Sequence, residues 1–136
     1  ADMLDTYKGE MDEVVYRRCR YVVDENQRLL DACAALEKGD YVTFGQKMNG
    51  SHEGLSRQYE VSCDELDFLA DIGHRTDGVL GARMMGGGFG GCTINLVRAE
   101  AYDGYLAEAT DRFAHRFGHA PRVIEVNISQ GARRIG

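Results

Sequence analysis

Apolar residues recur every three or four positions through the first half of the chain, which is the spacing of helices with one apolar side. The first helix is predicted from Met11 to about Glu37, and Gly39 ends it. Residues 1–10 show no clear period and are predicted to be a polar lead-in. The apolar stripe of this helix lies opposite its charged residues and consists of Val15, Cys19, Val22, Leu29, Cys33 and Leu36.

A second helix is predicted to begin after Asp40, whose carboxylate is placed to cap it. Three glycines inside this helix, Gly45, Gly50 and Gly54, weaken it and therefore predict close packing against a neighbouring element. Its apolar stripe consists of Tyr41, Phe44, Met48, His52, Leu55 and Tyr59.

A third, shorter helix is predicted from the capping-box spacing of Ser62 and Glu65 to about Arg75. Asp77 and Gly78 mark the turn that follows it. The residues of this helix that are predicted to face the core are Leu66, Leu69 and Ile72.

The remaining elements are a hairpin, a helix and a last strand. Residues 79–85 are extended in pattern, residues 92–97 alternate apolar and polar side chains, and a glycine-rich loop joins them. A fourth helix fits residues 100–117, and 123–128 is predicted to be the final strand. Helices that outnumber a small, mostly antiparallel sheet predict an α+β fold, in which one layer of helices covers the sheet in a two-layer sandwich. The fourth helix is predicted to point these residues to the core: Tyr105, Ala109, Phe113 and Phe117.

Composition narrows the class of protein. A length of 136 residues suits a single domain, and 43% hydrophobic residues with one proline favour a regular, folded chain. The net charge of −6 and the scattered arginines exclude a basic surface for binding nucleic acid. No apolar run reaches membrane-spanning length. Four widely spaced cysteines without a C-x-x-C pair predict reduced thiols in a cytoplasmic protein. The chain opens with alanine, which suggests a processed or truncated polypeptide.

The loop from Gly86 to Gly91 carries five glycines in six residues. A dinucleotide-binding fingerprint must lead from a strand into a helix, whereas this loop leads into a strand. A phosphate-binding P-loop must end in Gly-Lys-Ser/Thr, and the chain has no lysine after Lys47. Two interpretations stay open: the loop is a long hairpin turn alone, or its backbone amides form a cradle near an anionic ligand or a neighbouring phosphate loop.

Three side-chain features have both a functional and a structural interpretation. His52 is either a core histidine with satisfied hydrogen bonds or a residue of a cleft between domains. Arg83 either meets a phosphate or carboxylate, or pairs with a local acid. His115 and His119 have the i, i+4 spacing of metal ligands, but Gly118 disturbs that helix and no third ligand is evident, so no metal site is predicted.

The stretch from Gly81 to Thr93, Gly-Ala-Arg-Met-Met-Gly-Gly-Gly-Phe-Gly-Gly-Cys-Thr, resembles the third signature motif of galactokinases. These enzymes belong to the superfamily named after galactokinase, homoserine kinase, mevalonate kinase and phosphomevalonate kinase. Residues 39–41, 51–52 and 59–67 are also similar to galactokinase sequence, so the resemblance runs from about Arg17 to Ile128. N-acetylgalactosamine kinases typically have Gly-Ala-Gly-Trp where this chain has Gly-Gly-Gly-Phe. Met85 and Asp64 depart from the usual threonine and proline of the family.

The resemblance implies the C-terminal, ferredoxin-like domain of an enzyme that transfers the γ-phosphoryl group of ATP to the anomeric hydroxyl of galactose with Mg²⁺. The family's catalytic aspartate, its arginine partner and its serine-rich phosphate loop lie in the N-terminal domain and have no counterpart here. The isolated chain is therefore expected to hold no catalytic residue, to bind neither ATP nor Mg²⁺ alone, and to be inactive. The residues expected to support the phosphate loop are Gly86, Gly87, Gly88, Phe89, Gly90 and Gly91, with Arg83 and His52 near the cleft.

Two further predictions concern the loop surface. Met84, Met85 and Phe89 are expected to form an exposed apolar patch that drives self-association of the isolated chain. Gly88 is expected at the hairpin tip against the missing domain, where a larger side chain would meet no core atoms of this chain. A galactose-responsive regulator without catalysis and a free-standing small-molecule-binding module stay open as alternatives.

Overall fold

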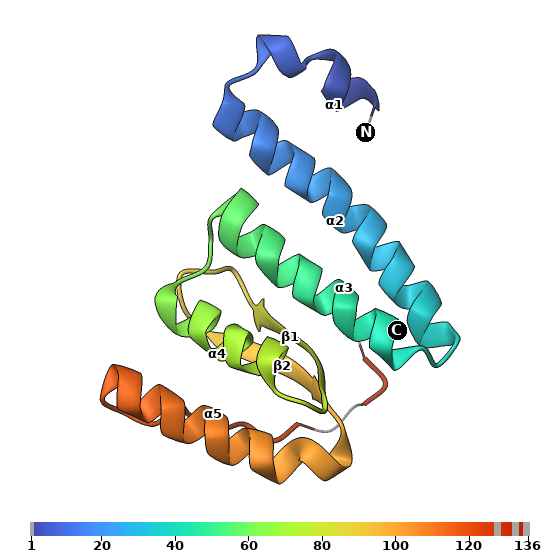
Figure 1. Cartoon of the computed structure of the whole chain (residues 1–136). Helices are drawn as coiled ribbons and strands as arrows, with labels where there is room; N and C mark the ends of the chain where they lie inside the picture. The colour runs from blue at the N-terminus through green and yellow to red at the C-terminus, as the bar shows by residue number, and fades with distance from the viewer. Residues whose placement is uncertain (1, 127–128, 132–133, 135–136) are drawn as a thin grey trace.

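The computed structural model describes residues 2–126, 129–131 and 134. Figure 1 shows the helices stacked side by side, with a hairpin of two strands among them. The elements in chain order are α1 (Asp2–Thr6), a 3-10 turn (Lys8–Glu10), α2 (Glu13–Glu37), α3 (Tyr41–Gly54), a π-helical turn (Leu55–Tyr59), α4 (Asp64–Arg75), β1 (Val79–Met85), β2 (Cys92–Val97), a 3-10 turn (Ala99–Ala101) and α5 (Tyr102–Phe117).

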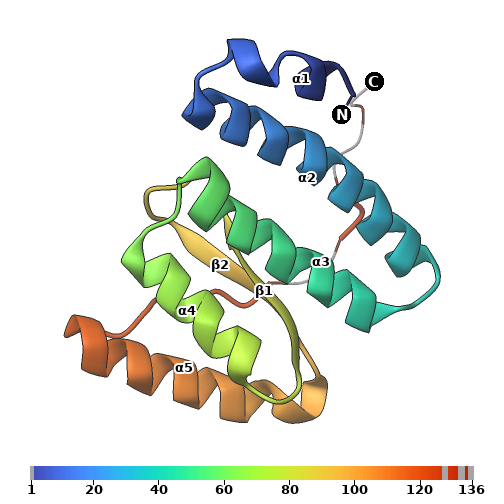
Figure 2. The same cartoon turned by 45° about the horizontal axis from the view of Figure 1, so that its top comes forward.

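The helices form successive layers around the hairpin. Helices α3 and α4 pack against β1, α5 packs against α4, and α2 lies on the far side of α3 from the strands (Figures 1 and 2). The predicted α+β class, with helices layered on a small antiparallel sheet, is confirmed. No helix in the part of the chain that the structure describes is long and apolar enough to cross a membrane.

The hairpin is antiparallel, from Val79 opposite Val97 to Met85 opposite Cys92, with an irregularity between Val79 and Gly81. The glycines of α3 explain how closely this helix approaches the hairpin. A Cβ on Gly45 would overlap the carbonyl group that precedes Gly81 and lie 3.0 Å from the Gly81 nitrogen. The backbones of α3 and β1 therefore touch, which confirms the prediction of close packing at these glycines.

The core lies between α4, α5 and the strands. Ile72, Tyr105 and Ala109 form its centre, and partly buried Phe68, Val79 and Val97 pack against them. Burial raises the pKa of the Tyr105 hydroxyl to about 12, because the phenolate would lose its hydration. The inward side predicted for α5 is observed at Tyr105, Ala109 and Phe113, which are buried.

The first 37 residues contain two features that the sequence pattern did not predict. The polar lead-in contains α1 and a 3-10 turn rather than irregular chain. The apolar stripe of α2, which would ordinarily face the core, points to solvent, and the buried residues of this helix are Tyr21 and Ala35. Tyr21 is drawn inward because Gly54 of α3 leaves room for its ring, which an added Cβ would overlap.

The junction between α3 and α4 also differs from the prediction. The α-helical hydrogen bonding of α3 stops at Gly54, and Leu55–Tyr59 continue as one π-helical turn. The capping box is wrong, because the N-cap is Cys63 and no side chain caps the helix there. Ser62 Oγ is buried without a hydrogen-bond partner, so this hydroxyl does not reach the helix amides.

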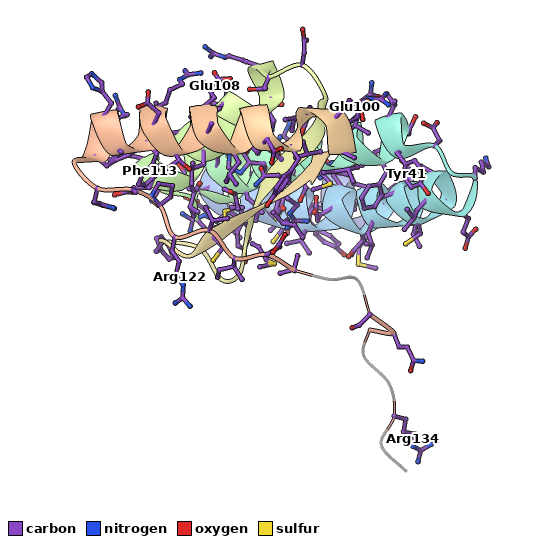
Figure 3. All side chains as sticks on the ribbon, turned by 90° about the horizontal axis from the view of Figure 1, so that it is seen from below. Tyr41, Glu100, Glu108, Phe113, Arg122 and Arg134 are labelled. Carbon is purple, nitrogen blue, oxygen red and sulfur yellow. The ribbon has the colours of Figure 1, made fainter. Side chains whose placement is uncertain are left out.

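The predicted final strand is also wrong over its described part. Residues 123–126 form no strand, while 127 and 128 lie outside the described residues. Figure 3 shows this segment passing below the strands, with Arg122 pointing away from the helices. A strand needs a neighbour to exchange backbone hydrogen bonds, and the described sheet contains only β1 and β2.

Candidate functional site at the glycine hairpin

The loop between β1 and β2 adopts backbone conformations that are unfavourable for residues with a side chain. Gly86, Gly88, Gly90 and Gly91 have φ of 103°, 94°, 135° and 113°. Phe89 adopts the left-handed region at φ 59°, which is uncommon for a residue with a side chain. Such outliers persist only where surrounding contacts hold them, and they concentrate at ligand clamps and active sites.

The contact that holds the loop is made by its own chain. The Phe89 N–H donates to the Val61 carbonyl oxygen at 2.7 Å. A Cβ on Gly88 would overlap that carbonyl and lie 2.7 Å from Val61 Cβ. The expectation that Gly88 faces only a missing domain is therefore wrong, because Gly88 is pressed against the segment before α4.

That segment is itself fixed by α2. After the π-helical turn, Glu60 reverses the chain in the left-handed region at φ 62°, and the Val61 N–H donates to Leu55 O at 3.0 Å. The Glu60 carboxylate accepts from Arg17 at 2.6 Å and Arg18 at 3.2 Å. Hydrogen bonds from these arginines hold the pKa of Glu60 below its usual value. Single π-helical turns inside helices are frequent at functional sites, and this one positions the support of the loop.

The other side of the loop is open. An added Cβ on Gly86, Gly87 or Gly90 would meet no atom within 4 Å. Phe89 is 78% exposed, and its ring borders a hollow of about 250 Å³ together with Arg18, Tyr59, Glu60 and Val61. The loop is thus pinned on one side and presents bare backbone on the other.

The patch predicted around the loop is smaller than expected. Met85 and Phe89 are exposed, whereas Met84 is completely buried, so its inclusion was wrong. Successive side chains of a strand point to opposite faces, so Met84 is buried while the next residue, Met85, is exposed. Self-association of the isolated chain stays a prediction.

His52 lies under β1 rather than on a surface. It is 5% exposed, and its Nδ1 accepts a hydrogen bond from the Met84 N–H at 3.1 Å. Its Nε2 lies 3.2 Å from Asp67 Oδ1, although the two atoms are not aligned for a hydrogen bond. The other Asp67 oxygen accepts from Ser56 at 2.8 Å. Burial lowers the pKa of His52, so the neutral ring holds the strand just before the loop.

Arg83 is paired locally. Its Nε donates to Met84 O at 3.0 Å, and its Nη1 lies 3.8 Å from Glu25 Oε1 on α2. Glu25 also accepts from Arg28 and Ser51, so several partners share one carboxylate. The structure brings His52 and Arg83 to the loop end of β1, but not against the exposed side of the loop.

Among the described residues, no group of three or more His, Cys, Asp and Glu side chains is placed to hold a metal ion. His119 Nδ1 lies 3.3 Å from Ala120 O, and its ring packs on Phe113 with 5.5 Å between centroids. The donors present thus do not form a Mg²⁺ site within this part of the chain.

The support from α2 was missed by sequence reasoning. Arg17, Arg18, Glu60 and Val61 determine where the loop sits, yet they are separated by some forty residues and share no periodicity. The one available signal was that Glu60 and Val61 lie in a stretch similar to galactokinases.

The fold and the site together define a class of protein. It is an α+β domain whose glycine hairpin is held by the segment between α3 and α4. The family model described as "GHMP kinases C terminal" matches residues 32–115. That match covers well over half of the chain, and the chain belongs to this family.

The individual proteins that are similar to this chain are galactokinases. The galactokinase of Clostridium beijerinckii is 41% identical over 92% of this chain and 32% of its own length. That of Streptococcus thermophilus is 44% identical over 90% of this chain and 31% of its own length. A crystal structure of Lactococcus lactis galactokinase complexed with galactose superimposes with a TM-score of 0.82 at 36% identity, over 88% of this chain and 31% of that one. The resemblance to the galactokinase C-terminal region is confirmed, and the chain spans about a third of the length of the curated relatives it matches.

Proposed function

We propose that this chain is a single domain, the C-terminal domain of a cytoplasmic, ATP-dependent galactokinase. In that enzyme the γ-phosphoryl group of ATP passes to the anomeric hydroxyl of galactose. The observation that carries the proposal is the two-sided glycine loop, held by Val61 on one side and bare on the other. Two backbones can approach closely only where side chains are absent, so the bare side is suited to a neighbouring phosphate loop.

The role of this chain's residues is positioning. Phosphoryl transfer depends on aligning the reacting oxygens and stabilising their charge, and small misplacements lower the rate strongly. Gly86, Gly87 and Gly90 present backbone without side chains, and the Glu60–Val61 turn fixes its place. His52 and Asn49 tie the preceding strand to α3 through the Met84 and Ala82 amides, at 3.1 and 2.8 Å. When bound, ATP supplies the phosphoryl group and Mg²⁺ neutralises its charge, while the groups that react belong to the N-terminal domain.

The test is galactose-dependent ADP release in a coupled assay. The whole gene product should phosphorylate galactose, and the isolated chain should not, because the family's catalytic aspartate and phosphate loop have no counterpart in its sequence. Sugar-dependent ADP release by the isolated chain that survives repurification would contradict the proposal. A whole gene product that binds galactose without releasing ADP would favour the alternative function, a galactose-responsive regulator without catalysis.

A further inference from the structure

Helix α2 carries its apolar stripe on the outside of the molecule. Val22, Leu29 and Leu36 are 45%, 61% and 49% exposed, and Val15 is exposed in the same way. These four residues are spaced seven apart, so they lie along one side of the helix. Leu30 and Cys33, also exposed, widen the stripe near its end. We call this set of six residues the α2 stripe.

The side of α2 that faces α3 combines the buried Tyr21 and Ala35 with several polar contacts. Lys47 of α3 donates to Asp31 at 2.7 Å, Ser51 donates to Glu25, and the Arg28 side chain crosses over Gly50. A surface helix of a globular protein normally turns its apolar stripe to the core and its charges to water. Helix α2 departs from this arrangement because most of its apolar residues are exposed, as expected of a helix whose apolar side is buried by another body.

The dimensions of the α2 stripe suit an interface between domains. From Val15 to Leu36 it runs 21 residues, about 31 Å at 1.5 Å per residue. Exposed Asn26 interrupts the stripe between Val22 and Leu29, but so many exposed apolar residues along one side of a surface helix still mark an interaction site. At its start the stripe adjoins the glycine hairpin, because Arg18, one turn from Val15 and Val22, lines the hollow beneath Phe89.

We propose that the α2 stripe is covered by the part of the same polypeptide that precedes residue 2. This inference rests on the proposed function, since it takes the chain to be one domain of a longer kinase. About two-thirds of the length of each relative lies outside the matched region. Arg18 lies between the start of the α2 stripe and the hollow beside Phe89, so a domain that meets the loop is within reach of the stripe.

Helix α1 is fastened beside the first half of α2 and does not cover the α2 stripe, whose residues are exposed. The Asp5 carboxylate accepts from Tyr16 at 2.8 Å and from Arg20 at 2.9 Å, so α1 is fastened beside α2. Figure 2 shows α1 running back along α2, from the start of α2 towards its middle. The covering surface must offer a matching apolar strip, and a helix with apolar residues at seven-residue spacing meets that requirement.

Cys33 gives a direct test, because its thiol lies within the α2 stripe and is exposed in this structure. The whole gene product is treated with a maleimide, and labelled peptides are identified by mass. We expect Cys33 to react at least tenfold more slowly in the native protein than in urea, after correction for the intrinsic effect of urea on a model thiol. Ala107→Cys on the exposed side of α5 is the control and should react rapidly in both. A native Cys33 that reacts as fast as the control overturns the inference.

A pair of substitutions tests the same surface from the other side. Val22→Glu with Leu29→Glu in the whole gene product should raise the Cys33 labelling rate at least tenfold. Val123→Glu with Ile124→Glu, at two similarly exposed apolar residues outside the stripe, should leave it unchanged. Protection that grows with protein concentration, together with a dimer in sedimentation, would identify a second copy as the occupant and overturn the inference.

The readout is independent of catalysis. If Cys33 is protected at all concentrations but galactose is not phosphorylated, the interface stands and the proposed function fails. If galactose is phosphorylated while Cys33 reacts freely, the proposed interface is refuted and the proposed function stands.

Discussion

Gly45→Ala tests the contact that joins the helices to the hairpin. Alanine is the better helix former by about 0.5–1 kcal/mol, so local propensity alone predicts a stabilised protein. The structure predicts the opposite, because the new Cβ would overlap the Leu80 carbonyl group and lie 3.0 Å from the Gly81 nitrogen. Both neighbours are backbone atoms and cannot rotate away, so α3 and β1 must separate.

The separation affects more than the new contact. Overpacking costs about 1–3 kcal/mol. The hydrogen bonds from the Ala82 and Met84 amides to Asn49 and His52 span the same junction at 2.8 and 3.1 Å. Weakening each costs about 1 kcal/mol. After the gain in propensity, the net loss in the free energy of unfolding is about 2–4 kcal/mol.

Urea denaturation followed by circular dichroism measures this loss. Gly104→Ala is the matched control, because Gly104 also lies in a helix and its added Cβ meets no atom within 4 Å. A Gly45→Ala midpoint equal to or above that of the wild type would refute the close approach of α3 and β1.

Other contacts of the fold give four more predictions. Gly104→Ala itself should raise the free energy of unfolding by about 0.5–1 kcal/mol in the same urea titration; a loss would argue against its helical, open environment. Gly88→Val should lower it by about 1–3 kcal/mol, because a branched residue is forced to φ 94° against Val61; an unchanged midpoint would remove that contact. The folded-state pKa of His52 is lowered, so its contribution to stability is complete above the unfolded pKa near 6.5 and is lost as the pH falls through the folded value. His52→Asn should flatten that dependence in urea titrations between pH 5 and 8, and an unaltered slope would assign it to other groups. The isolated chain should associate through its exposed apolar residues, and a monomer in sedimentation at high concentration would contradict this.

Local pattern predicted the elements whose partners lie within the chain. The fourth helix was placed correctly because Tyr105, Ala109 and Phe113 are buried against α4 and the strands, so period and burial agree. The hairpin was placed correctly because its alternation and its glycines are local signals. The glycines of α3 correctly indicated close approach, since only an absent Cβ permits it.

The failures share a physical origin. Periodicity found most of the α2 stripe, with Cys19 in place of Leu30, but not its direction, because spacing does not say which body covers an apolar side. Alternation at 123–126 predicted a strand, but a strand forms only where a neighbour supplies hydrogen bonds. At the site, the loop glycines were found from sequence, whereas its clamp at Glu60 and Val61 depends on arginines some forty residues away. Such contacts follow from the packing of α2 and α3, and no local pattern in the sequence indicates them.

The central claim is that the bare side of the glycine loop meets the domain that holds the phosphate of ATP. Gly87→Val tests it most directly, because Gly87 has no left-handed φ and its added Cβ meets no atom of this chain. In the whole gene product, the account predicts that Gly87→Val lowers kcat for galactose phosphorylation by about a hundredfold. The urea midpoint should stay unchanged, and Gly104→Val on α5 should leave both quantities near those of the wild type. A Gly87→Val enzyme that phosphorylates galactose at the wild-type rate would show that the loop is only a turn, and would contradict the account.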